Sequence, residues 1–295
     1  MSSKTYPRLL ITGKNGQVGQ ELTGRAAELA IDFVAFDSSE LDICDRAAVL
    51  AAVEKHQPTA VVNAAAYTAV DKAEEEKELA YAVNRDGVEN LALACKAQDI
   101  LFIHISTDYV FDGSKEGAYL ESDQPSPNSV YGASKYAGEE VLRAIWHKHV
   151  IVRVSWVFGA KGNNFVKTML RLASERDQLS VVSDQFGAPT SARFIASEAL
   201  RVSGLEGAYG LSHLPSDPGV SWYDFANIIF EEAKSLGLLA SVPVVSPLSS
   251  DQYPTPVERP KNSKLGSERG IFKTSLWRDE LILMLKQLHT AQENS

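Results

Sequence analysis

The first half of the chain alternates short, almost continuously apolar runs with longer amphipathic segments. Strands that are apolar on both faces are typical of a parallel sheet covered by helices on both sides. The expected strands are 8–12, 32–36, 60–63, 101–106 and 150–155, and the expected helices between them are 18–30, 46–55, 79–98 and 131–145. We therefore predict an α/β fold with a Rossmann-type doubly wound parallel sheet.

The second half of the chain has a looser pattern. Helices are expected over 164–175, 192–203 and 221–235, with proline-containing stretches between them. The stretch from Tyr253 to Pro260 holds three prolines, so it forms neither a regular helix nor a central strand. Long proline-stiffened loops are often binding segments. We predict a sheet domain over residues 1–157 and a smaller, partly interleaved region over 158–295, of which about 180–220 packs back on the sheet.

Composition limits the ligands that such a fold would bind. The 295 residues include 38 acidic and 29 basic side chains, a net charge of −9 that disfavours nucleic acid. Cys44 and Cys95 are too few for a disulfide framework or a cysteine zinc site. The apolar runs are too short to cross a membrane, and no apolar signal segment precedes the first expected strand. A cytoplasmic protein with a small-molecule ligand is expected.

A glycine-rich turn stands between the first expected strand and the first expected helix. Gly13, Gly16 and Gly19 are spaced for a tight turn, for close approach of a pyrophosphate and for close helix–strand packing. The amides at the start of the helix would face the phosphates. Three glycines can also form a plain turn, but this position indicates a dinucleotide.

Further cofactor contacts are expected at the ends of the next strands. Asp37 is placed to accept from the adenosine ribose hydroxyls, which favours NADH, although Lys14 offsets its charge and NADPH stays open. Asp37 can also simply cap a turn. Asp42-Ile43 is expected near the adenine, and the small residues 64–66 let the cofactor approach the backbone or merely pack well.

A tyrosine and a lysine stand four residues apart at the start of the helix 131–145. Tyr131 and Lys135 would share one helix face, where the lysine ammonium favours the phenolate and lowers the tyrosine pKa. Thr107 follows the fourth strand, at the sheet edge where ligands bind, and its hydroxyl would polarise a carbonyl. His104, within that strand, is expected to be a hydrogen-bonded core histidine or to lie beside the cofactor. A Tyr–Lys pair alone also occurs by chance, but the three signals together predict a reductase.

These segments resemble the extended short-chain dehydrogenase/reductase superfamily and, within it, the family of dTDP-4-dehydrorhamnose reductases. The shared motifs are Gly13-Lys-Asn-Gly-Gln-Val-Gly19, Val62-Asn-Ala-Ala-Ala66, Ala69-Val-Asp-Lys-Ala-Glu74, Ser106-Thr-Asp-Tyr-Val-Phe111, Tyr131-Gly-x-x-Lys135, Ser155-Trp-Val157, Gly162-Asn-Asn-Phe165, Asp184-Gln-Phe-Gly-Ala-Pro-Thr190, Tyr253-Pro-Thr-Pro256 and Arg259-Pro-x-Asn-Ser263. They span positions 13 to 263. The motifs from Ser155 onward are the more specific to the reductase family.

The resemblance implies a function and a set of site residues. NAD(P)H would reduce the C4 ketone of dTDP-4-dehydro-β-L-rhamnose to dTDP-β-L-rhamnose, the last step of dTDP-rhamnose synthesis for polysaccharides. Residues 1–157 would bind the cofactor, and 158–295 mainly the sugar nucleotide. The implied catalytic residues are Thr107, Tyr131 and Lys135. The implied cofactor residues are Gly13, Gly16, Gln17, Val18, Gly19, Asp37, Asp42, Ile43, Ala65, Ala66, Tyr67, Thr68 and Lys135. The implied substrate residues are Thr107, Asp108, Tyr131, Trp156, Asn164 and Arg259, with Lys167 and Arg171 as further candidates.

Three alternatives stay open. A sugar-nucleotide dehydratase of the same superfamily would carry a second carboxylate after Asp108, where this chain has Tyr109, and an epimerase would need a further acid/base pair. A non-catalytic regulatory subunit would not need Tyr131 and Lys135. Some members of the family bind Mg²⁺ at a dimer contact. Glu21 matches one such position, but Arg193 replaces another acidic residue, so no metal is expected, and a homodimer stays open.

Overall fold

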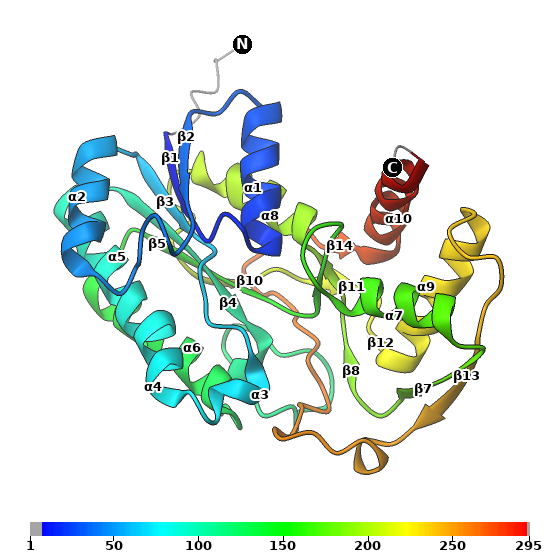
Figure 1. Ribbon diagram of the computed structural model, residues 1–295. Helices are drawn as coiled ribbons and strands as arrows, with labels where there is room; N and C mark the ends of the chain where they lie inside the picture. Colours follow the sequence, from blue (N-terminus) through cyan, green and yellow to red (C-terminus); the bar gives the residue numbers. More distant parts are fainter. Residues whose placement is uncertain (1–7, 294–295) are drawn as a thin grey trace.

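The centre of the computed structural model, which describes residues 8–293, is a six-stranded parallel sheet (Figure 1). Its strand order is β10-β5-β4-β3-β1-β2. The strands are β1 (Leu9–Thr12), β2 (Phe33–Phe36), β3 (Ala60–Asn63), β4 (Leu101–Thr107), β5 (His149–Val154) and β10 (Gly210–His213). The chain order reverses at β1 and β3, and the carboxyl ends of strands at such a point form a ligand crevice. The predicted fold class is confirmed.

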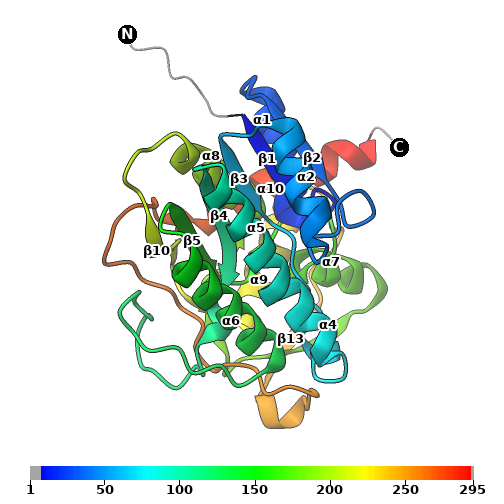
Figure 2. The same ribbon diagram turned by 90° about the vertical axis from the view of Figure 1, so that its left-hand side faces the viewer.

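Helices cover both faces of this sheet (Figure 1), and Figure 2 looks onto the face covered by α2, α5 and α6. On one face, α2 (Arg46–His56), α5 (Gly87–Ala97) and α6 (Val130–Ile145) enclose a core that includes Leu91, Phe102 and Leu142. On the other face, α1 (Gln17–Glu28) and α8 (Ala192–Ser203) enclose a second core around Leu22, Ile103 and Ile195. Two fully buried faces explain why the strands read as continuous apolar runs.

The last strand of the sheet, β10, was not predicted. Its sequence Gly-Leu-Ser-His lacks a β-branched run, and it pairs with β5 only because α8 returns the chain to the sheet. The segment over about 180–220 therefore contains both α8 and β10.

The expected helix 79–98 is interrupted. It consists of α4 (Lys77–Tyr81), a π-helical turn η1 (Ala82–Asp86) and α5. In that turn the Asn84 amide donates to Ser134 on α6 and to the Tyr67 carbonyl. Gly138 allows the close approach of α6, since a Cβ there would lie 2.1 Å from the Asn84 carbonyl oxygen. π-Turns often mark functional sites.

The remaining elements build a second region beside the carboxyl edge of the sheet (Figure 1). Its core includes Phe158, Phe225, Phe230 and Trp277. The helices there are α7 (Phe165–Glu175), α9 (Trp222–Ser235) and α10 (Trp277–Glu293), and the paired strands are β6 (Val157–Phe158) with β9 (Thr190–Ser191), β7 (Gln178–Val182) with β13 (Val244–Leu248), β8 (Phe186–Gly187) with β12 (Val220–Ser221), and β11 (Ser216–Asp217) with β14 (Ser275–Leu276). Short helices complete the chain: α3 (Val70–Ala73), η2 (Asp108–Val110) and η3 (Ser250–Gln252). Across residues 8–293, no helix combines the length and apolarity that crossing a bilayer requires.

Candidate active site

Two adjoining cavities lie between the carboxyl edge of the sheet and the second region. The smaller, about 560 Å³, is lined by the start of α1, the ends of β4 and β5 and the first turns of α6. The larger, about 820 Å³, is lined mainly by the second region and the segment 253–263. Because both are lined by Thr68, Val70, Tyr109, Trp156 and Trp222, they form one cleft. Its size suits two ligands lying end to end.

The glycine turn lies at the floor of the smaller cavity. Gly13 has a φ of 74°, and a Cβ on Gly19 would lie 2.0 Å from the Gly13 carbonyl oxygen. Gly16 caps α1 without a side chain, which leaves the first amides of the helix to a ligand. Gly16, Gln17 and Val18 line the cavity. Uncapped amides at the positive end of a helix fit the phosphates of a dinucleotide.

Replacing Gly19 with Ala should weaken cofactor binding at least tenfold, or about 1.4 kcal/mol. The new Cβ would press the Gly13 carbonyl out of the turn that shapes the phosphate site. Titration of NADPH fluorescence measures the change. Gly24→Ala on the same helix is the matched control, because the nearest atom to its Cβ, Lys161 Nζ, is 3.9 Å away. Equal affinities for the two variants would contradict the assignment of the turn.

The structure separates the other predicted cofactor residues into two groups. Ala66 and Thr68 line the smaller cavity. Asp37, Asp42, Ile43, Ala65 and Tyr67 do not line it, and their cofactor role stays a prediction. Asp37 accepts from Ser39 and from Asn15 of the glycine turn, and the hydrogen bonds from Ser39 lower its pKa. Ile43 packs in the core under α2 and α5.

The predicted catalytic residues meet in the smaller cavity. Thr107, at the end of β4, donates through Oγ1 to Asp108 Oδ1 at 3.1 Å and accepts from the backbone N–H of Tyr109 at 3.2 Å. Ser129 caps α6 by accepting from Gly132 at 3.0 Å, which fixes the helix start that carries Tyr131. Lys135 lies one turn further on, and all three predicted residues line the cavity.

The expected lowering of the Tyr131 pKa is wrong. Burial raises this pKa, and the Thr107 hydroxyl only partly opposes it. Lys135 Nζ donates to the Ile105 carbonyl at 2.7 Å, and burial lowers the Lys135 pKa to about 8. Tyr131 is therefore a protonated phenol at neutral pH, which is the form that donates a proton.

Asp108, directly after β4, is buried. Burial raises its pKa to about 6, against the opposing hydrogen bonds from Ser263 and Thr107. Asp108 lines the smaller cavity. A carboxyl group in this position can accept a hydrogen bond from a ligand hydroxyl.

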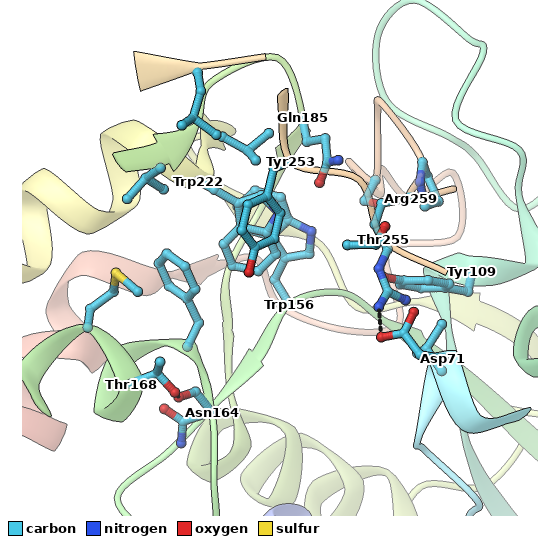
Figure 3. Close-up of a pocket in the computed structure, with 18 of the residues that line it drawn as sticks. Asp71, Tyr109, Trp156, Asn164, Thr168, Gln185, Trp222, Tyr253, Thr255 and Arg259 are labelled. Carbon is cyan, nitrogen blue, oxygen red and sulfur yellow. Dashed lines mark hydrogen bonds and ion pairs between the residues drawn. The ribbon is translucent and has the colours of Figure 1, made fainter. Parts of the chain in front are cut away.

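The larger cavity has an aromatic wall, drawn in Figure 3. Trp156 and Trp222 stack with ring centroids 3.4 Å apart and planes 6° apart. A Cβ on Gly187 would lie 2.3 Å from the Trp156 indole, so the ring passes directly over this glycine. Asn164 and Thr168 lie on the α7 side of the cavity (Figure 3). Flat aromatic surfaces beside polar groups suit a ligand with a sugar or a base.

The proline-stiffened segment forms the opposite wall. Tyr253, Thr255 and Arg259 line the larger cavity, and Arg259 Nη2 donates to Asp71 of α3 at 2.5 Å (Figure 3). Trp222, Gln185 and Asp71 also line the larger cavity and were not predicted. Trp222 lies at the start of the expected helix 221–235, and this position is the feature of the sequence that could have indicated a site residue.

Lys167 and Arg171 lie away from this cleft. Lys167 Nζ donates to the Gly162 carbonyl, and Arg171 pairs with Glu175 on the same helix. Both line a separate surface pocket with Leu238 and Leu239. Over the described range 8–293, no group of three or more His, Cys, Asp or Glu side chains is placed to hold a metal ion.

Comparison with known proteins assigns the chain to a family. Residues 7–290 match the model of the RmlD substrate binding domain. The chain belongs to this family. RmlD relatives named dTDP-4-dehydrorhamnose reductase include one from Aggregatibacter actinomycetemcomitans at 47% identity and one from Escherichia coli K12 at 44%, each aligned over 88% of this chain and 90% of the relative. The family resemblance predicted from the motifs is confirmed.

Solved structures of dTDP-4-dehydrorhamnose reductases are similar to this chain. The dTDP-4-dehydrorhamnose reductase of Clostridium acetobutylicum is 38% identical, with a TM-score of 0.90 over 96% of this chain and 99% of that one. The Bacillus anthracis reductase, solved in complex with NADP, is 36% identical, with a TM-score of 0.90 over 96% of this chain and 100% of that one.

Proposed function

We propose that this protein is a reductase that uses NADPH or NADH to reduce the C4 ketone of dTDP-4-dehydro-β-L-rhamnose to dTDP-β-L-rhamnose. The observation that carries the proposal is that Thr107, Tyr131 and Lys135 all line the smaller cavity. The closely similar relatives named dTDP-4-dehydrorhamnose reductase indicate the substrate. The reaction would be the last step of dTDP-rhamnose synthesis, in the cytoplasm.

The chain's own groups perform the steps around the transferred hydride, which the bound nicotinamide supplies. The glycine turn and the start of α1 hold the cofactor phosphates. The Thr107 hydroxyl, turned from Asp108 toward the substrate, would donate to the C4 oxygen and polarise the ketone. Tyr131, held protonated by burial, gives its proton to that oxygen as negative charge develops there. Lys135 lines the same cavity, and its ammonium form would stabilise the resulting phenolate.

The larger cavity would hold the rest of the sugar nucleotide. Asp108 and Trp156 face the sugar from the cofactor side, and Asn164 lies on the α7 side. Arg259 brings a guanidinium group to the cavity from the segment 253–263 and suits the diphosphate. Under this proposal residues 1–157 bind mainly the cofactor and 158–295 mainly the substrate. A homodimer stays a prediction.

Replacing Asp37 with Asn should shift cofactor preference toward NADPH by about three- to tenfold. A carboxylate beside the adenosine ribose repels a 2′-phosphate, and Lys14, 3.8 Å away, is drawn to Glu40 instead. The ratio of kcat/KM for the two cofactors measures the shift. Asp32→Asn, at the other end of β2, is the control. An unchanged ratio would remove Asp37 from the ribose site.

The dehydratase alternative loses support at Tyr109. This side chain stands where that reaction needs a second carboxylate, and burial raises its pKa to about 12. Its ring packs edge-on against Tyr131, with centroids 5.4 Å apart. Tyr109 therefore forms part of the wall behind the proton donor and has no charge for base catalysis at neutral pH.

A panel of 4-ketosugar nucleotides, each assayed with NADH and NADPH, tests the proposed function. We expect oxidation of the cofactor with dTDP-4-dehydro-β-L-rhamnose, and formation of dTDP-β-L-rhamnose by mass and NMR analysis. Turnover only with a uridine or guanosine sugar would make the protein another sugar-nucleotide 4-reductase. No turnover with any of them would support the regulatory-subunit alternative.

A further inference from the structure

A row of buried polar side chains crosses three neighbouring strands of the apolar sheet and ends at Lys135. Thr12, Asn63 and His104 are in register on β1, β3 and β4, and all are buried. Thr12 Oγ1 donates to Asn63 Oδ1 at 2.6 Å, and Asn63 Nδ2 lies 3.0 Å from His104 Nδ1. His104 Nε2 lies 3.4 Å from Lys135 Nζ. Burying polar groups costs free energy unless each is paired, so this row has a specific arrangement.

The Asn63 amide has one orientation that satisfies its neighbours. Its Oδ1 accepts from the Thr12 hydroxyl and also from the backbone N–H of Ala65 at 3.0 Å. Turning the amide over would set its NH₂ group against that N–H, with two donors facing each other. Asn63 Nδ2 is therefore the donor toward His104, and His104 Nδ1 is the acceptor. In a neutral imidazole the proton is then on Nε2, the nitrogen that faces Lys135.

His104 is held in the neutral form. Its burial lowers its pKa well below the ordinary value, and the positive charges of Lys135 and His149 act in the same direction. The Nε2–H group of His104 points toward Lys135 Nζ. It disfavours the ammonium form of the lysine, because an ammonium has no lone pair to accept this hydrogen bond. The same N–H can donate to a neutral amine.

The surroundings of the Lys135 amino group shift its pKa in opposite directions. Glu139, one turn further along α6, raises the Lys135 pKa, while burial lowers it. Tyr131 lines the same cavity one turn earlier as a neutral phenol, and the Ile105 carbonyl accepts from Nζ at 2.7 Å. From β4, the side chain that faces Nζ is His104. His104 therefore adds to the effect of burial and opposes Glu139.

We propose that His104, oriented by Asn63, is a positioning residue that favours the neutral amine of Lys135 and thereby sets the pH at which this lysine gains its charge. The inference rests on the proposed function only in treating Lys135 as catalytic. If catalysis uses the ammonium form, activity falls as pH rises through the Lys135 pKa. Removing the His104 N–H then raises that pKa and moves the alkaline limb of the pH profile to higher pH.

The tautomer can be measured on the ligand-free protein. In a sample labelled with ¹⁵N-histidine, the imidazole nitrogen shifts of His104 are assigned among the six histidines by comparison with the His104→Gln variant. We expect a neutral Nε2–H tautomer throughout about pH 5.5 to 9. A proton on Nδ1, or titration of this imidazole near the ordinary histidine pKa, would overturn the proposal.

The effect on Lys135 is measured with two variants. In His104→Gln, the amide can turn its oxygen toward the ammonium, so the alkaline limb of kcat/KM should move up by about half a unit to one unit. Thr12→Val is the matched control: it breaks the far end of the row, but the Ala65 N–H still orients Asn63, so the limb should stay in place. A limb unmoved in His104→Gln, or moved equally in both variants, would refute the proposal.

The role of His104 can be tested even if the protein shows no reductase activity. The titration of Lys135 can be followed directly by ¹³C NMR of labelled lysine, assigned with Lys135→Met. The same upward shift is expected in His104→Gln and not in Thr12→Val. An unshifted Lys135 titration would reject the role of His104 whether or not the protein turns over a ketosugar.

Discussion

Tyr131→Phe should lower kcat at least 100-fold while leaving NADPH binding unchanged. General acid catalysis contributes about 10²- to 10⁴-fold, and the phenol of Tyr131 is the protonated group that joins Thr107 in the smaller cavity. The ring stays in place, since its packing against Tyr109 does not involve the hydroxyl. Single-turnover reduction of the ketosugar measures the chemical step, and fluorescence titration measures cofactor affinity.

The control for this prediction is Tyr136→Phe on the same helix. Tyr136 packs against the cluster of Val110 and Phe111, away from the cavity lining. It should keep kcat within about twofold. If Tyr131→Phe retained a comparable kcat, another group would be the proton donor.

Breaking the buried ion pair behind the active site should cost about 3–5 kcal/mol of unfolding free energy. Arg153 on β5 donates from Nε to Glu139 Oε1 at 2.9 Å and from Nη2 to Oε2 at 2.6 Å, and both side chains are at most 1% exposed. Ser106, beside Thr107, also donates to this carboxylate. Glu139→Gln or Arg153→Met alone leaves one buried charge unpaired, which urea unfolding detects.

Two comparisons test the physical reason for this loss. The double variant Glu139→Leu with Arg153→Met removes both charges, so it should recover most of the stability. Arg143 and Glu140 form an exposed pair on the same helix, and Arg143→Met should cost only about 0–1 kcal/mol. A double variant as unstable as the sum of its single variants would show that the loss comes from packing and not from the unpaired charge.

Local patterns were enough to predict five strands of the sheet and several residues that line the smaller cavity, among them Thr107, Tyr131 and Lys135. Continuous apolar runs indicate a sheet that is covered on both faces. The turn itself requires glycine at positions 13, 16 and 19. Tyr131 and Lys135 share a helix turn, and Thr107 ends a strand at the ligand edge, so neighbouring residues already specify these three positions. A further strand of the same sheet, β10, was missed because its pairing depends on where α8 brings the chain.

The electrostatics of the site depends on burial, which the sequence does not display. The spacing of Tyr131 and Lys135 predicted a lowered tyrosine pKa, yet burial raises this pKa. Lys135 Nζ donates to the Ile105 carbonyl. Contacts between distant segments were also out of reach: Arg259 meets Asp71 across 188 positions, and Trp222 stacks on Trp156. No local pattern relates such pairs.

The sequence by itself thus determined the fold class and the family and predicted the reacting groups, because these follow from short-range periodicity and from motifs of fixed spacing. Only the tertiary structure decided the protonation state of Tyr131, the hydrogen-bond row that ends at Lys135 and the aromatic wall of the larger cavity. The physical reason is that the charge states of side chains and the walls of a cavity depend on which side chains shield one another from water. Those side chains come together only when the chain folds.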